Sequence, residues 1–203
     1  MSAPIKILCF YLVNAVLLAG CASVPVQVNE TSERVRAQIE RLRSAPCCTP
    51  LSGITYVPIS KGESPHFQID ESSPIVQVLN GKAYAGGIEI PPRLSVTYLT
   101  VRGFGIGIWA PSSTNFLPAF LFFDGFGAPL KDAVKWSVRP ARADWNNRSS
   151  LEALIELPPS KVPTRVLVYA DPAELNKRTP KIVDAGVFMV PNGPFGSFRV
   201  YLP

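Results

Sequence analysis

Histidine is nearly absent from this sequence, with His66 alone among 203 residues. A Ser-His-Asp or Cys-His catalytic arrangement would have to use that one imidazole, and no nucleophile motif such as G-x-S-x-G surrounds it. We interpret His66 as a solvated side chain and predict that the protein is not an enzyme. A hydrolase with two carboxylates from distant positions is the alternative that this reasoning leaves open.

The usual metal and cofactor motifs are also missing. One histidine with the neighbouring Cys47 and Cys48 makes a poor zinc set, and the fifteen carboxylates form no EF-hand-like run. There is no Walker loop, and Gly103–Gly107 lacks the strand–helix setting of a dinucleotide fingerprint. The tightest acidic pair, Asp70 and Glu71, is predicted to lie in a turn. We therefore expect no metal and no cofactor.

Charge is scarce, because only 17% of the residues are Asp, Glu, Lys or Arg and the net charge is +5. The basic residues are scattered, apart from four arginines between Arg34 and Arg43. This pattern excludes the concentrated basic face of a nucleic-acid-binding protein. A hydrophobic content of 47% instead indicates a folded domain.

The apolar run Ile7–Leu18 is too short for a transmembrane helix, which needs about 20 residues. Lys6 precedes the run and a small-residue cleavage site follows it, which is the order of a secretory signal peptide over residues 1–20. The stretch Leu-Ala-Gly-Cys ending at Cys21 resembles the bacterial lipobox. The resemblance implies cleavage between Gly20 and Cys21, and an acyl anchor containing palmitate on Cys21.

Two alternatives to lipidation stay open, an uncleaved anchor and an ordinary signal peptide. Ala22 follows the cysteine, and by the usual sorting pattern of Gram-negative lipoproteins this implies the periplasmic face of the outer membrane. Residues 21–31 contain Pro25 and the polar residues Gln27 and Asn29, and we predict a flexible tether there.

One amphipathic helix is predicted over residues 32–43, capped by Thr31 or Ser32. Val35, Ile39 and Leu42 fall at i, i+4 and i+7 and form a narrow apolar stripe. The stripe fits a helix that lies on the domain. The alternative is a helix that binds a protein partner or a second copy.

The helix and the turn that follows it form the segment 32–53, and Cys47 and Cys48 lie in that turn. Cys9 leaves with the signal peptide and Cys21 carries lipid, so two adjacent cysteines are left in an oxidising compartment. A disulfide between the neighbours, intermolecular bridges, and two buried thiols are the three possibilities.

Residues 54–203 are predicted to form an all-β domain, an antiparallel sandwich of jelly-roll kind. The 21 prolines and 14 glycines separate short apolar runs at the spacing typical of such folds. Pro58 indicates an edge strand, and Asn80-Gly81 indicates a type I′ hairpin turn. Residues 119–123 are apolar on both faces and are predicted to form a central buried strand. The strands are expected over residues 54–59, 66–70, 75–79, 83–90, 94–102, 103–109, 119–123, 134–138, 150–157, 165–170, 183–190 and 197–202, with one helical turn over 171–177.

The three tryptophans are candidates for a sugar platform. Trp136 alternates with Val134 and Val138, so we predict that it is buried; Trp109 is also interpreted as core. Trp145 lies in a polar loop beside Asp144 and Asn146, where stacking and hydrogen bonding could combine on a carbohydrate. A structural role for Trp145 is the plainer alternative.

The segment FLPAFLFFDGFGAPLKDAV and the later LEALIELPPSKVPTRVLVYADPAELNKRTP resemble the maltose operon periplasmic protein family over about residues 45–180. The lipobox leader and the Pro-Cys-Cys before the first strand are also similar. The resemblance implies a non-enzymatic periplasmic protein with a role in the envelope or in carbohydrate uptake. Two functions follow as hypotheses: an accessory or interaction module of the envelope, or a carbohydrate-binding accessory protein.

Overall fold

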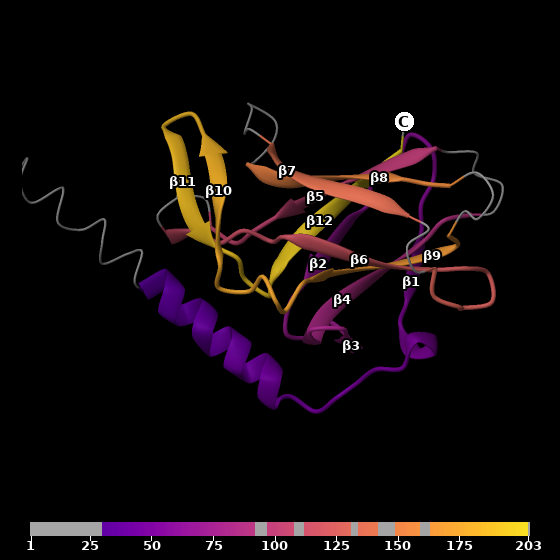
Figure 1. Ribbon diagram of the computed structural model, residues 1–203, viewed down its shortest axis with the longest axis horizontal. Helices are drawn as coiled ribbons and strands as arrows, with labels where there is room; N and C mark the ends of the chain where they lie inside the picture. The colour runs from indigo at the N-terminus through magenta and orange to yellow at the C-terminus, as the bar shows by residue number, and fades with distance from the viewer. Residues whose placement is uncertain are drawn as a thin grey trace, which may run out of the picture.

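The structure is a computed structural model that describes residues 30–91, 97–107, 112–130, 134–141, 149–158 and 163–202. Within these ranges the chain forms two facing sheets, a two-stranded ribbon, one α-helix (residues 30–44) and a short 3-10 helix, η1 (Leu51–Gly53) (Figure 1). The predicted all-β sandwich with one preceding helix is confirmed.

Sheet I has the hydrogen-bonded order β1-β4-β9-β6, and β3 pairs with the first half of β4. Its strands are β1 (Tyr56–Pro58), β3 (Ile75–Val78), β4 (Gly81–Glu89), β6 (Pro118–Phe123) and β9 (Arg165–Ala170). β1 runs parallel to β4, whereas the other pairs are antiparallel. β1 lies at the edge of the sheet, as Pro58 predicts, because proline cannot donate to a neighbouring strand.

Sheet II has the order β2-β12-β5-β8-β7, and every pair in it is antiparallel. Its strands are β2 (His66–Ile69), β12 (Gly196–Tyr201), β5 (Tyr98–Phe104), β8 (Ser150–Glu156) and β7 (Lys135–Ala141). The chain passes repeatedly between the sheets, so that β2, β12, β5 and β8 face β4, β9 and β6. These crossings give the jelly-roll-like arrangement that the turn spacing predicts.

The main core fills the space between the two sheets, and a second apolar cluster covers the outer side of sheet I. β9 contributes to both clusters, because Val166 and Val168 face the main core while Leu167 and Tyr169 face the second cluster. A strand buried on both faces reads as a continuous apolar run. Sheet I is therefore covered on both sides.

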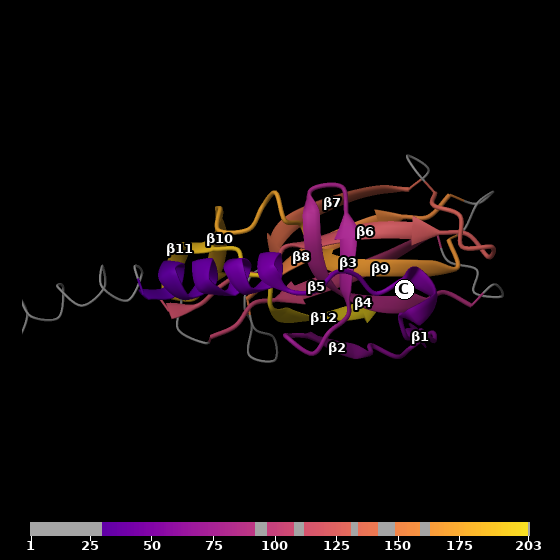
Figure 2. The ribbon, with the colours of Figure 1, turned by 90° about the horizontal axis from the view of Figure 1, so that it is seen from below.

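The helix lies along one side of the sandwich, from the ribbon to the β3–β4 hairpin (Figures 1 and 2). Val35, Ile39 and Leu42 are all buried, and Leu42 joins the main core. At its C-terminal end, Lys82 Nζ donates to the Arg43 carbonyl oxygen at 2.9 Å, which satisfies a carbonyl that has no partner within the helix. The prediction that the helix lies on the domain is confirmed, and its apolar stripe is occupied.

The β3–β4 hairpin is present, but its turn differs from the prediction. The register pairs Val78 with Gly81, so Leu79 and Asn80 form the turn. A type I′ turn needs positive φ at both central residues, yet Asn176 is the sole non-glycine residue with positive φ in the described ranges. The predicted type I′ turn at Asn80-Gly81 is therefore wrong. Gly81 takes its φ of 132° at the start of β4.

The strand predicted to be central, β6, is buried but is the last strand of sheet I. Phe120 and Phe122 lie in the main core and Phe123 lies in the second cluster, so both faces are covered. Pro129 forms a bridge with Phe123, and the Leu130 N–H donates to the Phe122 carbonyl at 2.8 Å. An apolar run on both faces therefore reports burial and not a central position in the sheet.

Glycine permits a close backbone approach after Arg102. A Cβ atom on Gly103 would lie 2.6 Å from the Phe116 carbonyl oxygen, and one on Gly105 would overlap the Thr114 carbonyl. The separate strand predicted over residues 103–109 is not formed in its described part. β5 ends at Phe104, and residues 108–109 lie outside the described ranges.

Two C-terminal elements also differ from the prediction. The single strand expected over residues 183–190 is a hairpin, the ribbon of β10 (Arg178–Val183) and β11 (Gly186–Pro191), which turns at residues 184–185. The helical turn expected over residues 171–177 is a pair of hydrogen-bonded turns, from the Glu174 N–H to the Asp171 carbonyl and from the Lys177 N–H to the Glu174 carbonyl. Short sequence patterns do not distinguish a single strand from a hairpin, or a helical turn from two successive hydrogen-bonded turns.

Candidate binding surface

The outer side of sheet II carries mostly polar, charged and aromatic side chains, which are exposed or half-exposed except for the buried Glu152. Strand alternation assigns them, because the residues between them point into the main core. We call this surface the open face. Its residues are His66 and Gln68 on β2, Ser197, Arg199 and Tyr201 on β12, Tyr98, Thr100, Arg102 and Phe104 on β5, Glu152, Leu154 and Glu156 on β8, and Lys135, Ser137 and Arg139 on β7.

One row of charged residues crosses the whole open face. The register aligns one residue from each strand, in the order His66, Arg199, Arg102, Glu152 and Arg139. We call this set the charged row. It places three guanidinium groups and one carboxylate side by side, so it carries a net positive charge. Guanidinium groups bind carboxylates and phosphates through paired hydrogen bonds.

Glu152 lies between two arginines of the charged row and pairs with both. Arg102 Nε donates to Glu152 Oε2 at 2.8 Å, and Arg139 Nη2 donates to Oε1 at 2.7 Å. The Glu152 side chain is 11% exposed, whereas that of Arg139 is 78% exposed. Burial acts to raise the pKa of Glu152, but the hydrogen bonds and charges of the two arginines outweigh it, so the pKa lies below its usual value.

Aromatic side chains flank the charged row on the open face. The Arg102 guanidinium lies over the Tyr201 ring, 5.1 Å from its centre, and Tyr98 is 42% exposed. Stacking over an aromatic ring fixes the plane of a guanidinium group without consuming its hydrogen-bond donors. The surface therefore combines flat apolar groups with fixed donors.

Trp136 is 43% exposed, so the prediction that it is buried is wrong. It faces the main core, as its alternation with Val138 indicates, and its ring packs edge-on against Phe120 at 5.2 Å. However, β7 is the edge strand of sheet II, so part of the indole has no covering strand. A shallow hollow of about 130 Å³ lies here, lined by Lys135, Trp136, Ser137, Leu154 and Glu156.

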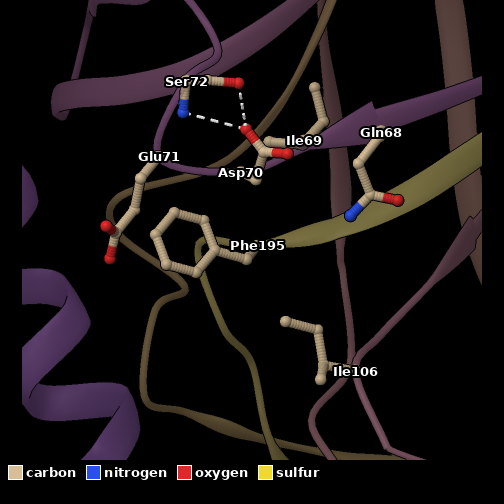
Figure 3. Close-up of a pocket in the computed structure, with 7 residues that line it drawn as sticks. All are labelled: Gln68, Ile69, Asp70, Glu71, Ser72, Ile106 and Phe195. Atoms are coloured by element: carbon tan, nitrogen blue, oxygen red, sulfur yellow. Dashed lines mark hydrogen bonds between the residues drawn. The ribbon is translucent and has the colours of Figure 1, made fainter.

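A larger open hollow, about 410 Å³, lies where the open face ends beyond β2. Its lining residues are Gln68, Ile69, Asp70, Glu71, Ser72, Ile106 and Phe195. Figure 3 shows the Phe195 ring between Glu71 and Ile106, with Gln68 on the neighbouring strand. The hollow thus adds an apolar floor to one end of the polar surface.

The two carboxylates of this hollow have structural partners. Asp70 accepts hydrogen bonds from the Ser72 N–H at 2.9 Å and from its hydroxyl at 2.6 Å (Figure 3). These bonds lower the pKa of Asp70. Glu71 pairs with Arg41 of the helix at 2.8 Å. The prediction that the pair lies in a turn is confirmed, and each carboxylate serves a local contact.

Cys47 and Cys48 form a disulfide in the structure, across a cis peptide bond. Cys47 is exposed, and its Sγ lies 3.8 Å from Gln77 Oε1 on β3. The Thr49 N–H donates to the Ile75 carbonyl at 2.7 Å. The cysteine pair therefore lies beside the β3–β4 hairpin, on the path from the helix to β1.

Several predicted site residues lie outside the described ranges. They are Gly20 and Cys21 of the leader, Trp109, and the sugar-site candidates Asp144, Trp145 and Asn146. The segment that contains Trp145 connects β7 to β8, the two strands at one side of the open face.

Sequence reasoning missed the charged row because its members come from five distant segments. Only the strand register aligns them, and a register depends on long-range pairing. The alternation of Arg102 with Val101 and of Glu152 with Ala153 was the available signal, since it places both charges on the solvent side of their strands.

In the part of the chain that the structure describes, no three His, Cys, Asp or Glu side chains gather in a way that could hold a metal ion. The helix found there is not long and apolar enough to cross a bilayer. Comparison with family models, curated proteins and solved structures finds no match. The resemblance to the maltose operon periplasmic protein family stays a prediction from the sequence pattern.

Proposed function

We propose that this protein is a non-catalytic lipoprotein of the bacterial envelope that binds a partner through its open face. Acylated Cys21 would anchor the chain to the periplasmic face of the outer membrane, and the tether would keep the domain within reach of other envelope components. The protein would then support an assembly or an uptake system.

The charged row is the observation that carries the binding proposal. Sheet I buries both of its faces, whereas sheet II leaves Arg199, Arg139 and Tyr98 accessible on one face. Glu152 fixes two of the three guanidinium groups before any ligand arrives. A surface with pre-positioned charged groups binds at a lower entropic cost than a mobile one.

Three acidic residues, the buried Glu152 and the neighbouring Asp70 and Glu71, each pair with another side chain, which supports a non-catalytic role. Glu152 is held by two arginines, Asp70 by Ser72, and Glu71 by Arg41. The low pKa of Glu152 keeps it ionised at neutral pH, which suits an ion pair and not a general acid.

We expect Cys21→Ser to move the protein out of the membrane fraction or to leave it as an uncleaved precursor. The thiol is the proposed acylation site, and serine cannot form the thioether. Fractionation of cells grown with radiolabelled palmitate measures both location and acylation. Cys9→Ser, which changes the same residue type inside the leader, is the matched control and should behave as the unsubstituted chain. Palmitate label on Cys21→Ser, or retention of the cleaved protein in the membrane fraction, would reject the anchor.

A carbohydrate is the second candidate ligand, and the aromatic residues of the open face favour it. Tyr98, Phe104 and Tyr201 lie on the same side of sheet II as the charged row. Sugars combine apolar ring faces with hydroxyl groups, so rings beside fixed hydrogen-bond donors suit them. The guanidinium groups favour saccharides that carry carboxylate or phosphate groups. The segment that contains Trp145 connects β7 to β8 of the same sheet.

Titration of the detergent-solubilised full chain with maltodextrins and acidic glycans, followed by tryptophan fluorescence, tests this candidate. We expect a saturable change and an affinity about tenfold weaker in Tyr98→Ala, which corresponds to about 1.4 kcal/mol. Trp145→Ala should also remove part of the signal. Phe126→Ala, which removes an aromatic ring that is 99% exposed on the loop after β6, is the control. No response to any glycan would reject the carbohydrate and leave a protein partner.

A further inference from the structure

The β10–β11 ribbon has one face that packs on the rest of the domain. Lys181 is 6% exposed and donates from Nζ to the Gly107 carbonyl at 3.3 Å. On the same face, Asn115 Nδ2 donates to Thr179 Oγ1 at 2.7 Å, and Val190 is buried. These contacts fix the orientation of the ribbon, so its opposite face must point away from the domain.

Beyond its base, where Arg178 pairs with the buried Pro191, that opposite face is apolar. The register pairs Ile182 with Val187 and Pro180 with Met189, and the four side chains form a cross-strand block. Val187 is 64% exposed and Met189 is 53% exposed. We call these four residues the ribbon face. Pro180 and Ile182 are half-buried beside these two exposed side chains. Four adjacent apolar side chains that reach solvent form a patch, and such patches mark contact sites.

The ribbon lies at the end of the molecule where the helix begins. Arg178, at the base of the ribbon, donates from Nη2 to Ser32 Oγ in the first turn of the helix at 3.4 Å. Both views show the ribbon and the start of the helix at the same end of the molecule (Figures 1 and 2). Cys21 precedes the helix by nine residues, a span of at most about 30 Å when fully extended.

We propose that the ribbon face lies on the phospholipid surface to which Cys21 is anchored. This inference rests on the lipid anchor proposed above. The tether confines the domain near the bilayer, which raises the effective concentration of lipid at this end of the molecule. Apolar side chains then enter the boundary between headgroups and acyl chains, as those of interfacial helices do.

The size of the ribbon face favours lipid over a second copy of the chain. A stable protein–protein interface takes about 20–30 residues from each partner. The ribbon face offers four apolar residues, too few for a stable dimer. A tethered domain needs only a weak additional contact to fix its orientation, and four side chains can supply it.

Fluorescence quenching by brominated lipid tests the proposal on the acylated full chain. The chain, labelled with radioactive palmitate, is reconstituted in phosphatidylethanolamine–phosphatidylglycerol vesicles whose acyl chains carry bromine. In Val187→Trp, we expect bromine to quench the emission of the added tryptophan by about half or more, because the side chain enters the interface. Leu79→Trp is the matched control, since Leu79 is 97% exposed in the β3–β4 turn, and its added emission should not change.

The outcomes separate this inference from the proposed function. A labelled, vesicle-bound Val187→Trp protein without quenching would overturn the ribbon contact and leave the anchor intact. A chain that takes up no palmitate would refute the anchor and the ribbon contact together. In the third outcome, the added tryptophan becomes more shielded from solvent as the protein density in the vesicles rises, but bromine does not quench its emission. This result would assign the ribbon face to a second copy and overturn the lipid contact.

Discussion

Replacing Phe198 with alanine should destabilise the protein by about 3–5 kcal/mol, the range for removing a buried phenylalanine. Phe198 is fully buried in β12, between β2 and β5 of sheet II. Its ring stacks on Phe67 with centres 4.5 Å apart, and the centre of the Phe116 ring lies 6.5 Å away. A tightly packed core relaxes only partly around such a cavity, so the lost contacts are not replaced.

Urea denaturation of the full chain in detergent, followed by circular dichroism, measures this change in the free energy of unfolding. Phe126→Ala is the matched control, because it deletes the same ring from a side chain that is 99% exposed. We expect the control to lie within about 0.5 kcal/mol of the unsubstituted protein. Equal effects of the two substitutions would mean that Phe198 does not occupy the core.

Glu152→Gln should reduce the free energy of unfolding by about 2 kcal/mol, as expected when hydrogen bonds to a charged group are lost. Glutamine keeps the size of the side chain but removes the charge. It also turns an amide donor toward Arg102 or Arg139, which are themselves donors. Arg102 is 31% exposed, so water compensates for part of the loss.

The pH dependence of stability provides a second readout for Glu152. Its pKa is lower in the folded protein than in the unfolded chain, so the folded state binds fewer protons at acidic pH. Its stabilising contribution is complete above the ordinary glutamate pKa of about 4.3 and is lost as the pH falls through the folded value. The difference between the unsubstituted protein and Glu152→Gln should therefore shrink on acidification.

Glu156→Gln is the control, since Glu156 lies on the same strand and the same face but is exposed. We expect a change within about 0.5 kcal/mol. A Glu152→Gln protein as stable as the Glu156→Gln protein at neutral pH would contradict the network at the centre of the charged row. Loss of ligand binding in Glu152→Gln without loss of stability would instead indicate direct ligand contact.

Residue patterns alone predicted the architecture of the domain. The turn spacing predicted the all-β sandwich, and the apolar run over residues 119–123 matched β6, a strand that is covered on both faces. The helix stripe predicted its buried side correctly, because a 3.6-residue period shows which side of a helix is apolar. These features depend on neighbours in the sequence.

The tertiary structure decided what depends on residues that are distant in the sequence. The alternation of apolar and polar residues predicted which residues share a face of a strand. It could not predict that β6 lies at the edge of its sheet or that residues 183–190 contain a turn. It also could not align Arg199, Arg102 and Glu152, because cross-strand register is set by packing of the whole core. The sequence by itself determined which face of a strand or helix is apolar. The pairing of strands determined which side chains meet and which, like Trp136 on the edge strand β7, stay partly exposed.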